Sequence, residues 1–346
     1  MILEQIIRQK ILEEGPISFS EFMAFALYDK DNGFYSHGGA GRRKDFITSP
    51  EVGPLFGKLV AKSIDRCWEE FDRPSNFTFL ECGAGPGTLA RSILRSEMKC
   101  ASYLDYVTVE PSERQRQKHP SSVRALSEMP DEIGIGMIFA NELLDNLPFD
   151  IFQSQKNGTW LEVKVGLEGS TFCEELFPST EKKRPQFTID KDNVRVPLQL
   201  AAQEWVERSL KILKNGRIII VDYTVPGFEN HEKKNWLRTY QQHEIINDPF
   251  TKIGLSDITS DVDLSQLTKV KEPTSIQNQA EWLQKLGLED QLKESKKIWK
   301  QSAHNPSISA IEARSAIGES EALIDPDGLG AFKVVEWLVE SNSQVA

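Results

Sequence analysis

The sequence lacks the features that mark membrane and secreted proteins. No apolar run among its 346 residues approaches the roughly 18 residues that a transmembrane helix needs. Residues 1–15 form an amphipathic helical pattern with acidic side chains, without the segments of a signal peptide or the acid-poor character of a transit peptide. We therefore expect a cytoplasmic protein that does not insert into a membrane.

Signals for metal and disulfide chemistry are absent as well. The four cysteines are widely separated in sequence and form no CxxC pair. Neither they nor the five histidines show the spacing of metal ligands, so we expect no metal. Separated thiols are typical of reduced, buried cysteines, which again fits a reducing compartment.

An excess of positive charge is also missing. The formal net charge is −11 at pH 7, whereas a nucleic-acid-binding protein normally presents a basic face. We therefore expect no nucleic-acid partner. The sequence also has no GxSxG nucleophile motif and no phosphate-binding loop ending in GK[ST], which disfavours serine hydrolases and P-loop proteins.

What is present is an ordinary globular composition, with 39% hydrophobic and 27% charged residues. The length suggests about two domains, or one large domain with insertions. We divide the chain into an N-terminal helical and lid region at residues 1–75 and a core at residues 76–346. Insertions into that core are expected near residues 149–198 and 224–285.

The spacing of apolar residues predicts helices first and alternating elements later. An apolar face in residues 3–11 predicts one helix, and Ser18 with Glu21 predicts the capping box of a second. From Phe77 onward, strands alternate with helices, and Asn157-Gly158 predicts the turn of a hairpin across residues 149–167. The alternation predicts an α/β fold with a parallel sheet. Strands are expected at 77–80, 106–109, 135–140, 217–221 and 332–338, and helices at 88–98 and 198–213.

The central motif is a glycine-rich turn between a predicted strand and a predicted helix. Its glycines, Gly83, Gly85 and Gly87, follow Glu81 in a GxGxG pattern, and the turn lies where open α/β sheets bind ligands. Glycine permits positive φ and a close approach of the backbone to a ligand. A dinucleotide fingerprint would need glycine or alanine at Thr88, so the spacing favours S-adenosylmethionine over a pyrophosphate-containing cofactor.

An acidic residue ends the next predicted strand. The carboxylate of Glu110 can accept hydrogen bonds from both ribose hydroxyls of such a cofactor. The alternative is a structural strand–helix turn with Glu110 merely solvated. The predicted cofactor-binding residues are Glu81, Gly83, Gly85, Gly87, Thr88, Glu110 and Asn141.

Several segments match a known family in order along most of the chain. They are Gly15–Ser18, Gly33–Tyr35, Lys44–Glu51, Leu55–Gly57, Glu81–Leu89, Ala140–Pro148, Asp222–Tyr223, Leu237–Tyr240 with His243, and Asp257–Thr259. The chain resembles the MidA-type methyltransferases, the family of a mitochondrial complex I assembly factor that methylates arginine. The resemblance implies a Rossmann-like, seven-stranded class I methyltransferase sheet with an N-terminal helical region and insertions. It also implies S-adenosylmethionine as cofactor and a protein as substrate.

The chain departs from the family pattern at two places. The glycine turn has no arginine, whereas the family often has GPGRG, and Lys44 stands where the family usually has glycine. These departures are typical of a bacterial branch. The substrate of the mitochondrial member therefore does not carry over to this chain.

The candidate catalytic residues are Asn141, Glu142 and Asp145, which follow the predicted strand 135–140. An arginine acceptor is permanently charged, so its site needs carboxylates to hold the planar guanidinium. If the chain after Asn141 is helical, Glu142 and Asp145 share one face. We expect Glu142 to orient the guanidinium and Asp145 to assist it. The alternative is that Asn141 or Asp145 caps a helix.

A second candidate region is the glycine-rich, charged stretch of residues 38–51. Asp45, Thr48 and Glu51 can close over cofactor or substrate as a lid, with the glycines as joints. The basic run 42–44 is expected to be solvated. His243 can act as a general base, although a structural histidine is more common.

The predicted function is methylation of a protein arginine by an S-adenosylmethionine-dependent enzyme. Three other functions compete with it. A non-catalytic assembly factor would keep the fold and bind a protein partner, and a small-molecule methyltransferase would share the cofactor site. A dinucleotide oxidoreductase is disfavoured because the glycine spacing is wrong.

Overall fold

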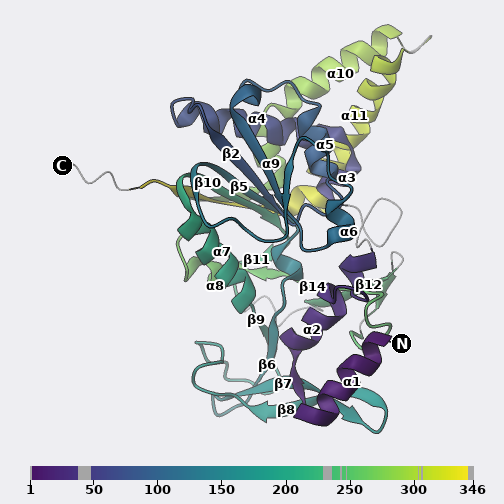
Figure 1. The fold of residues 1–346 in the computed structure, drawn as a ribbon, viewed down its shortest axis with the longest axis vertical. Coiled ribbons are helices and arrows are strands. Elements are labelled where there is room, and N and C mark those ends of the chain that lie inside the picture. The colour runs from purple at the N-terminus through teal and green to yellow at the C-terminus, as the bar shows by residue number, and fades with distance from the viewer. Residues whose placement is uncertain are drawn as a thin grey trace, which may run out of the picture.

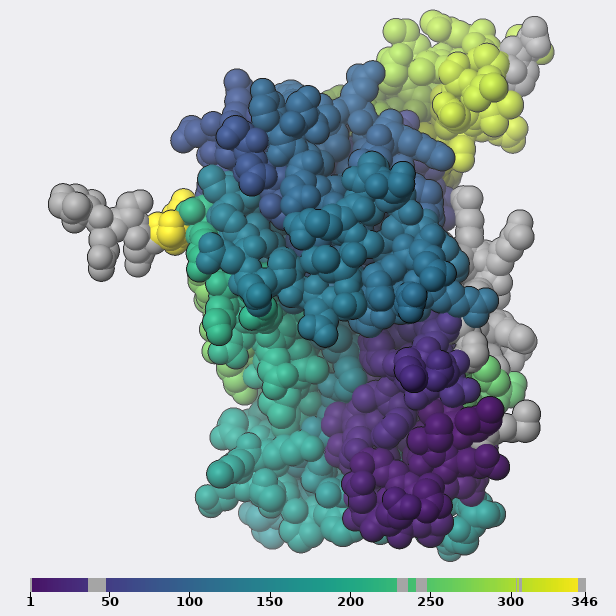
Figure 2. Space-filling model, viewed as in Figure 1, coloured from purple at the N-terminus to yellow at the C-terminus, as the bar shows by residue number. Residues whose placement is uncertain are grey.

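The computed structural model describes residues 2–37, 48–228, 236–241, 244–246, 248–302, 304 and 307–341. Figure 1 shows an upper lobe built on a large sheet and a lower lobe that contains the N-terminal helices. In Figure 2 the surfaces of the two lobes are continuous with each other. Within these described ranges, no helix has both the length and the apolar character that a membrane span requires.

A seven-stranded sheet forms the upper lobe, in the order β16-β17-β10-β5-β2-β3-β4. Strands β4, β3, β2, β5 and β10 run parallel, and β17 is antiparallel to both of its neighbours. The predicted α/β fold with a seven-stranded sheet is confirmed. Its strands are β2 (Phe77–Cys82), β3 (Leu104–Val109), β4 (Arg124–Leu126), β5 (Ile133–Asn141), β10 (Leu213–Asp222), β16 (Ser275–Asn278) and β17 (Lys333–Val339).

Successive residues of the central strands face opposite sides of this sheet, so each side has its own core. Phe79 and Phe139 lie in the core beneath α4 (Pro54–Glu70), α5 (Thr88–Leu94) and α9 (Gln279–Lys285). Leu80 and Ile138 lie in the core beneath α7 (Leu200–Ile212) and α8 (Leu264–Thr268). Because both faces of the sheet are buried, consecutive residues of its central strands must be apolar, and the sequence has this pattern.

The lower lobe combines the N-terminal helices with the first insertion. Helices α1 (Ile2–Glu14) and α2 (Phe19–Tyr28) share a core with the strands of a five-stranded sheet. The predicted hairpin is confirmed as β6 and β7, and the side chain of Ser18 caps α2 by accepting from the backbone N–H of Glu21. The sheet contains β1 (Ile17–Ser18), β6 (Asp150–Ser154), β7 (Trp160–Glu168), β8 (Thr171–Pro178) and β9 (Arg195–Leu198).

The remaining elements connect and extend the two lobes. A three-stranded sheet, in the order β13-β12-β14, contributes Ile258 to the lower core. Helices α10 and α11 pack together and project from the upper lobe (Figure 1). These elements are η1 (Phe34–His37), α3 (Ser49–Val52), η2 (Ala101–Tyr103), α6 (Glu113–Arg116), η3 (Leu144–Asn146), β11 (Thr224–Val225), β12 (Leu237–Gln241), β13 (Glu244–Ile246), β14 (Asp257–Ser260), β15 (Val262–Asp263), α10 (Leu288–Ser302), α11 (Ile308–Ile324) and η5 (Leu329–Ala331).

The packing crosses the predicted boundary at residue 75. Helix α4 belongs to the core of the seven-stranded sheet, whereas α1 and α2 belong to the lower lobe. The division into residues 1–75 and 76–346 stays a prediction. The helices before residue 75 pack into the cores of both lobes.

Two glycines allow β10 and β5 to pair closely, which yields a stability prediction. Gly216 has φ +142° and lies opposite Gly136, whose carbonyl oxygen occupies the position of a β-carbon at residue 216. We expect Gly216→Ala to lower the free energy of unfolding by roughly 1–3 kcal/mol. Urea unfolding followed by tryptophan fluorescence measures this loss. Gly134→Ala is the matched control, because no atom lies within 4 Å of its β-carbon position; an equal loss in both variants would contradict the packing argument.

Candidate active site

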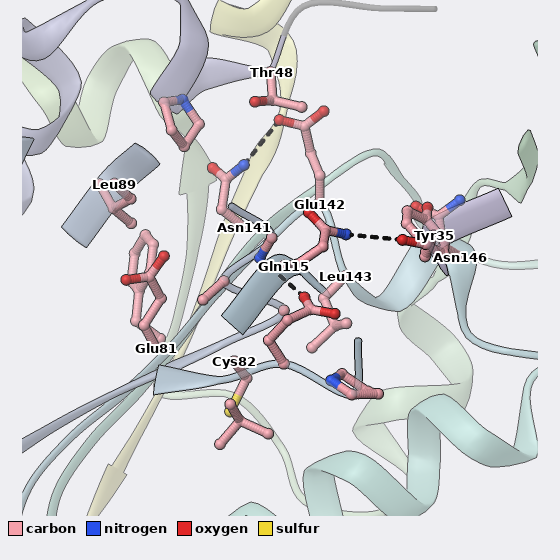
Figure 3. A pocket seen from close by; sticks show the side chains of 18 of the residues that line it. Tyr35, Thr48, Glu81, Cys82, Leu89, Gln115, Asn141, Glu142, Leu143 and Asn146 are labelled. Carbon is pink, nitrogen blue, oxygen red and sulfur yellow. Dashed lines mark hydrogen bonds between the residues drawn. The ribbon is translucent and has the colours of Figure 1, made fainter. Parts of the chain in front are cut away.

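A cavity of about 540 Å³ opens at the carboxyl ends of β2, β3 and β5 (Figure 3). The glycine turn and Glu110 form one side of its lining, and Asn141, Glu142 and Leu143 form another. Residues from the lower lobe, among them Tyr35, complete the wall. The cavity has the size of a small-molecule site and the position at which open α/β sheets bind ligands.

The glycine turn adopts the conformation expected from its sequence. Gly83, Gly85 and Gly87 have φ values of +68°, +51° and +76°, a region that other residues rarely occupy. The backbone N–H groups of Gly83 and Ala84 donate to the carbonyl oxygen of Val109 at 2.9 and 3.2 Å. These bonds join the turn after β2 to the end of β3, so the turn and the acidic residue after β3 are held together.

Glu110 lies in the cavity wall with its carboxylate fixed by backbone donors. Oε2 accepts from the N–H of Gly85 at 3.0 Å, and Oε1 accepts from the N–H of Ser112 at 2.9 Å. Burial raises the pKa of Glu110, although both backbone bonds oppose the shift. A carboxylate has about four lone-pair positions, so the group can still accept two ribose hydroxyls. Its placement therefore fits the predicted cofactor.

Side chains behind the turn hold its carbonyl groups away from the cavity. His119 donates from Nε2 to the carbonyl oxygen of Gly85 at 2.7 Å and accepts at Nδ1 from Thr108 at 2.9 Å. Arg91 donates to the carbonyl oxygen of Pro86 at 2.7 Å. Burial lowers the pKa of His119, which favours this neutral form. The sequence contained no signal for this support.

Gly87, the third glycine of the turn, was predicted to bind the cofactor. It is not among the residues that line the cavity, and a β-carbon there would lie 3.0 Å from the His119 ring. The positive φ and the close approach of His119 are sufficient reasons for a glycine at position 87. Glu81 and Thr88 do line the cavity. Glu81 accepts from the Tyr106 hydroxyl at 2.5 Å, and burial raises its pKa to about 7.

The chain after β5 is not helical, which corrects the predicted shared face of Glu142 and Asp145. Strand β5 continues through Asn141, and Glu142 has φ +52° before the short η3 turn. Glu142 lines the cavity, whereas Asp145 is buried outside the lining and accepts from the Thr259 hydroxyl at 2.7 Å. A left-handed non-glycine residue costs about 1–3 kcal/mol and often marks a functional site.

Glu142 presents one oxygen that no donor of the described residues reaches. Its Oε1 accepts from Asn141 Nδ2 at 2.8 Å and from the N–H of Ser49 at 3.3 Å. Its Oε2 is buried without a hydrogen-bond partner. Burial, with a smaller contribution from the charge of Asp145, raises the pKa of Glu142 to about 8.

Further buried carboxyl groups form a cluster with Glu142 and Asp145, and two of them were not predicted as site residues from sequence. Asp222 accepts from the N–H groups of Leu144 and Tyr223, both at 2.9 Å. Burial first, and then neighbouring carboxyl groups, raise the pKa of Asp222 strongly and that of Asp257 to about 7. Burial also raises the pKa of Asp145 to about 6. Asp222 and Asp257 stood in matched segments, but no local pattern placed them beside Glu142.

The lower lobe supplies an aromatic wall. Tyr28 and Tyr35 stack with ring centroids 5.4 Å apart, and both line the cavity. The Tyr35 hydroxyl donates to Asp257 Oδ1 at 3.1 Å, and the Tyr28 hydroxyl donates to the carbonyl oxygen of Asn146 at 3.1 Å. The sequence indicated Tyr35 only as part of a matched segment.

The predicted lid is described in part. Thr48 and Glu51 line the cavity beside Glu142, whereas Asp45, the basic run 42–44 and His243 lie outside the described residues. Across the part of the chain that the structure describes, no group of three or more His, Cys, Asp or Glu side chains could hold a metal ion.

The strand order, the glycine turn after β2 and the acid after β3 together define a Rossmann-like methyltransferase that uses S-adenosylmethionine. The sequence model of one such family, described as an S-adenosyl-L-methionine-dependent methyltransferase (Methyltransf_28), matches residues 59–281. The match spans more than half of the chain, and the chain belongs to this family.

Known relatives agree with this assignment. The mitochondrial protein arginine methyltransferase NDUFAF7 homolog of Drosophila melanogaster is 29% identical over 78% of this chain and 70% of its own length. NDUFAF7 of Danio rerio, also named a mitochondrial protein arginine methyltransferase, is 27% identical over 93% of this chain and 83% of its own length. A crystal structure from Burkholderia thailandensis with bound S-adenosyl-homocysteine has a TM-score of 0.81 and 26% identity, covering 97% of this chain and 92% of that one.

The turn geometry yields a test of cofactor binding. We predict that Gly85→Val raises the Kd for S-adenosylmethionine at least ~100-fold, because the side chain enters the cavity and disfavours φ +51°. Gly169→Val is the matched control, with φ +62° and open space at its β-carbon position outside the cavity. Calorimetric titration measures the Kd, and circular dichroism checks the fold. Unchanged affinity in folded Gly85→Val would refute the site.

The pKa of Glu142 yields a stability prediction. It is raised to about 8 in the folded chain, against about 4.3 in an unfolded one. The folded state therefore binds this proton more tightly, and the stabilisation is lost as the pH rises from about 4.3 to about 8. Glu142→Gln should raise the free energy of unfolding at pH 8.5 by about 0.5–2 kcal/mol, with a smaller difference at pH 5.5. Urea unfolding at both pH values measures it; parallel pH profiles of variant and wild type would contradict the shift.

Proposed function

We propose that this chain transfers a methyl group from S-adenosylmethionine to an arginine side chain of a protein. The supporting observation is that Glu142, Asp145 and Asp257 each keep a buried oxygen without a hydrogen-bond partner. Clustered buried carboxyl groups favour a cationic ligand nearby, and a guanidinium N–H can satisfy the free oxygen of Glu142, which lines the cavity. The relatives that are named protein arginine methyltransferases support the same acceptor.

Glu142 is the catalytic residue in this proposal. Donors of Asn141 and Ser49 occupy its Oε1, so only Oε2 remains for the acceptor. With a pKa of about 8, the carboxyl group is largely protonated at neutral pH in the free chain. A guanidinium keeps its charge up to about pH 12, so its arrival favours the carboxylate form, which binds and orients the planar N–H groups.

The residues of the cavity then perform the remaining tasks. The bound cofactor supplies a methyl group carried on a positively charged sulfur. Glu142 orients the guanidinium nitrogen and accepts the proton that this nitrogen loses when the N–C bond forms. The walls formed by Tyr28, Tyr35 and Leu143 exclude water, and orientation in such a site can lower the barrier by several kcal/mol.

Asp145 has an indirect role in this arrangement. It is buried next to Glu142, and after burial its charge raises the pKa of Glu142. Asp145 likewise raises the pKa values of Asp222 and Asp257, so the group as a whole favours a cation in the cavity. Arg238 lies beside this group and pairs with Asp261 at 2.8 Å, so part of the negative charge is already balanced. Asn141 acts by holding Glu142 Oε1.

The compartment and the partner belong to the proposal as well. We propose a cytoplasmic enzyme that acts on a protein and does not bind nucleic acid. The net charge of −11 supports the absence of a nucleic-acid partner. The names of the relatives support a protein substrate.

The proposed function predicts a separation of turnover from cofactor binding. We expect Glu142→Gln to lower kcat at least ~100-fold while changing the Kd for S-adenosylmethionine less than ~3-fold, because Glu142 acts on the acceptor. Glu132→Gln is the matched control. Glu132 is an exposed glutamate directly before β5, whereas Glu142 stands directly after the same strand. The assay uses radiolabelled cofactor with a lysate from cells that lack the protein, and mass spectrometry identifies the labelled residue.

Three results would contradict the proposal in different ways. Label found only on lysine or on a small molecule would remove arginine as the acceptor. Cofactor binding without any turnover in the wild type would favour the assembly factor that binds a partner. Equal losses of turnover and cofactor affinity in Glu142→Gln would remove Glu142 from the catalytic role.

A further inference from the structure

Gln115 is a buried amide in an otherwise exposed helix beside the cavity. In α6 its side chain is only 2% exposed, whereas Glu113 and Arg114 face solvent. Its Nε2 donates to the carbonyl oxygen of Tyr35 at 3.3 Å, across the junction of the two lobes. Its Oε1 is buried and has no hydrogen-bond partner among the residues that the structure describes. The mechanism described above does not use this residue.

The orientation of this amide is fixed by its partner. A backbone carbonyl oxygen can only accept, so the NH₂ group of Gln115 must face Tyr35 and the oxygen must face the other way. Figure 3 shows the amide nitrogen joined to Tyr35 and the rest of the side chain inside the cavity. A β-carbon at Gly85 would lie 3.7 Å from Oε1. The free oxygen is therefore next to the glycine turn, on the side that Glu110 also faces.

A buried acceptor of this kind destabilises the fold when no donor reaches it. Aliphatic side chains would fill the same space without that cost. Glu110 is the residue assigned to the ribose hydroxyls of the cofactor, and Gln115 Oε1 lies beside the same glycine turn. A ribose hydroxyl can therefore satisfy the oxygen of Gln115.

The Tyr35 end of this bridge continues into the group of buried carboxyl groups. The Tyr35 hydroxyl donates to Asp257 Oδ1, and Asn146 Nδ2 donates to the same oxygen at 3.0 Å. Tyr28 stacks on Tyr35 and bonds to the backbone of Asn146. Contacts therefore run without a break from Gln115 to the residues beside Glu142.

We propose that Gln115 is a positioning residue that couples cofactor binding to the lower lobe. Its oxygen accepts a hydrogen bond from a ribose hydroxyl of the bound cofactor, and its nitrogen holds η1 at Tyr35. Cofactor binding then orders Tyr35 and Asp257 before the acceptor enters. Because such coupling is reciprocal, an ordered lower lobe in turn strengthens cofactor binding. This inference concerns the cofactor alone and does not depend on arginine as the acceptor.

The first test uses the wild-type chain and S-adenosyl-homocysteine. Hydrogen exchange of the backbone amides in residues 34–37 should slow at least ~3-fold when this ligand saturates the protein, because Gln115 then holds Tyr35 more firmly. Unchanged exchange in this segment, under conditions where calorimetry shows saturation, would overturn the coupling. This measurement needs no variant and so does not depend on how a substitution affects folding.

The second test removes the amide while keeping its size. Gln115→Met should raise the Kd for S-adenosyl-homocysteine about 3- to 10-fold and abolish the slowing at residues 34–37. Gln117→Met is the matched control, since this exposed glutamine caps the C-terminus of the same helix and its side chain donates to Glu113 at the surface. Affinity and exchange that match the wild type in Gln115→Met would overturn the role of Gln115. Weakened affinity with the slowing retained would overturn its coupling to Tyr35.

The third test locates the donor on the ligand. 5′-Methylthioadenosine keeps the ribose and lacks the amino-acid part of the cofactor. We expect Gln115→Met to weaken both ligands by the same factor. A loss confined to S-adenosyl-homocysteine would overturn the assignment to a ribose hydroxyl. Thermal unfolding without ligand confirms that the variant is folded, and failure of the proposed arginine methylation would leave these binding results unchanged.

Discussion

The burial of carboxyl groups where β5 and β10 end is the constraint on which the rest of the site depends. A carboxylate out of water is costly unless donors or a cation compensate it. Backbone N–H groups satisfy both oxygens of Asp222, but Glu142, Asp145 and Asp257 each keep one buried oxygen without a donor. Burial therefore raises the pKa values of these three groups, and a cation next to them is favoured. The left-handed backbone at Glu142 places one of the groups in the cavity lining.

The cofactor side of the cavity is built by different means. There the backbone itself forms the binding surface, with Gly83 and Gly85 at positive φ, while His119 and Arg91 hold the carbonyl groups of Gly85 and Pro86. The acceptor side uses side chains that the lower lobe and the strand ends bring together. Gln115 and Tyr35 join the two sides, so the position of the lower lobe and the occupancy of the cofactor site are physically linked.

Much of the fold and part of the site could be predicted from local patterns. Apolar periodicity located the central strands, and the predicted positive φ of the three glycines is confirmed. The prediction that Glu142 and Asp145 share a helical face was wrong. Residues three apart share a face only in a helix, and the chain turns sharply after Asn141. Gly87 also fitted the pattern of a ligand-binding turn, but the close approach of the His119 ring is enough to explain why a glycine stands at this position.

The sequence by itself determined the order of strands and helices, the glycine turn and the acid after β3, because periodicity and backbone freedom are local properties of the chain. Only the tertiary structure decided that Asp222 and Asp257 join the buried carboxyl group of Asp145 next to Glu142, and that Gln115 meets Tyr35. These residues lie far apart in the chain, and their contacts depend on which strands become neighbours and how the two lobes pack. Burying like charges together raises the pKa values of these carboxyl groups, and this effect exists only once the chain has folded.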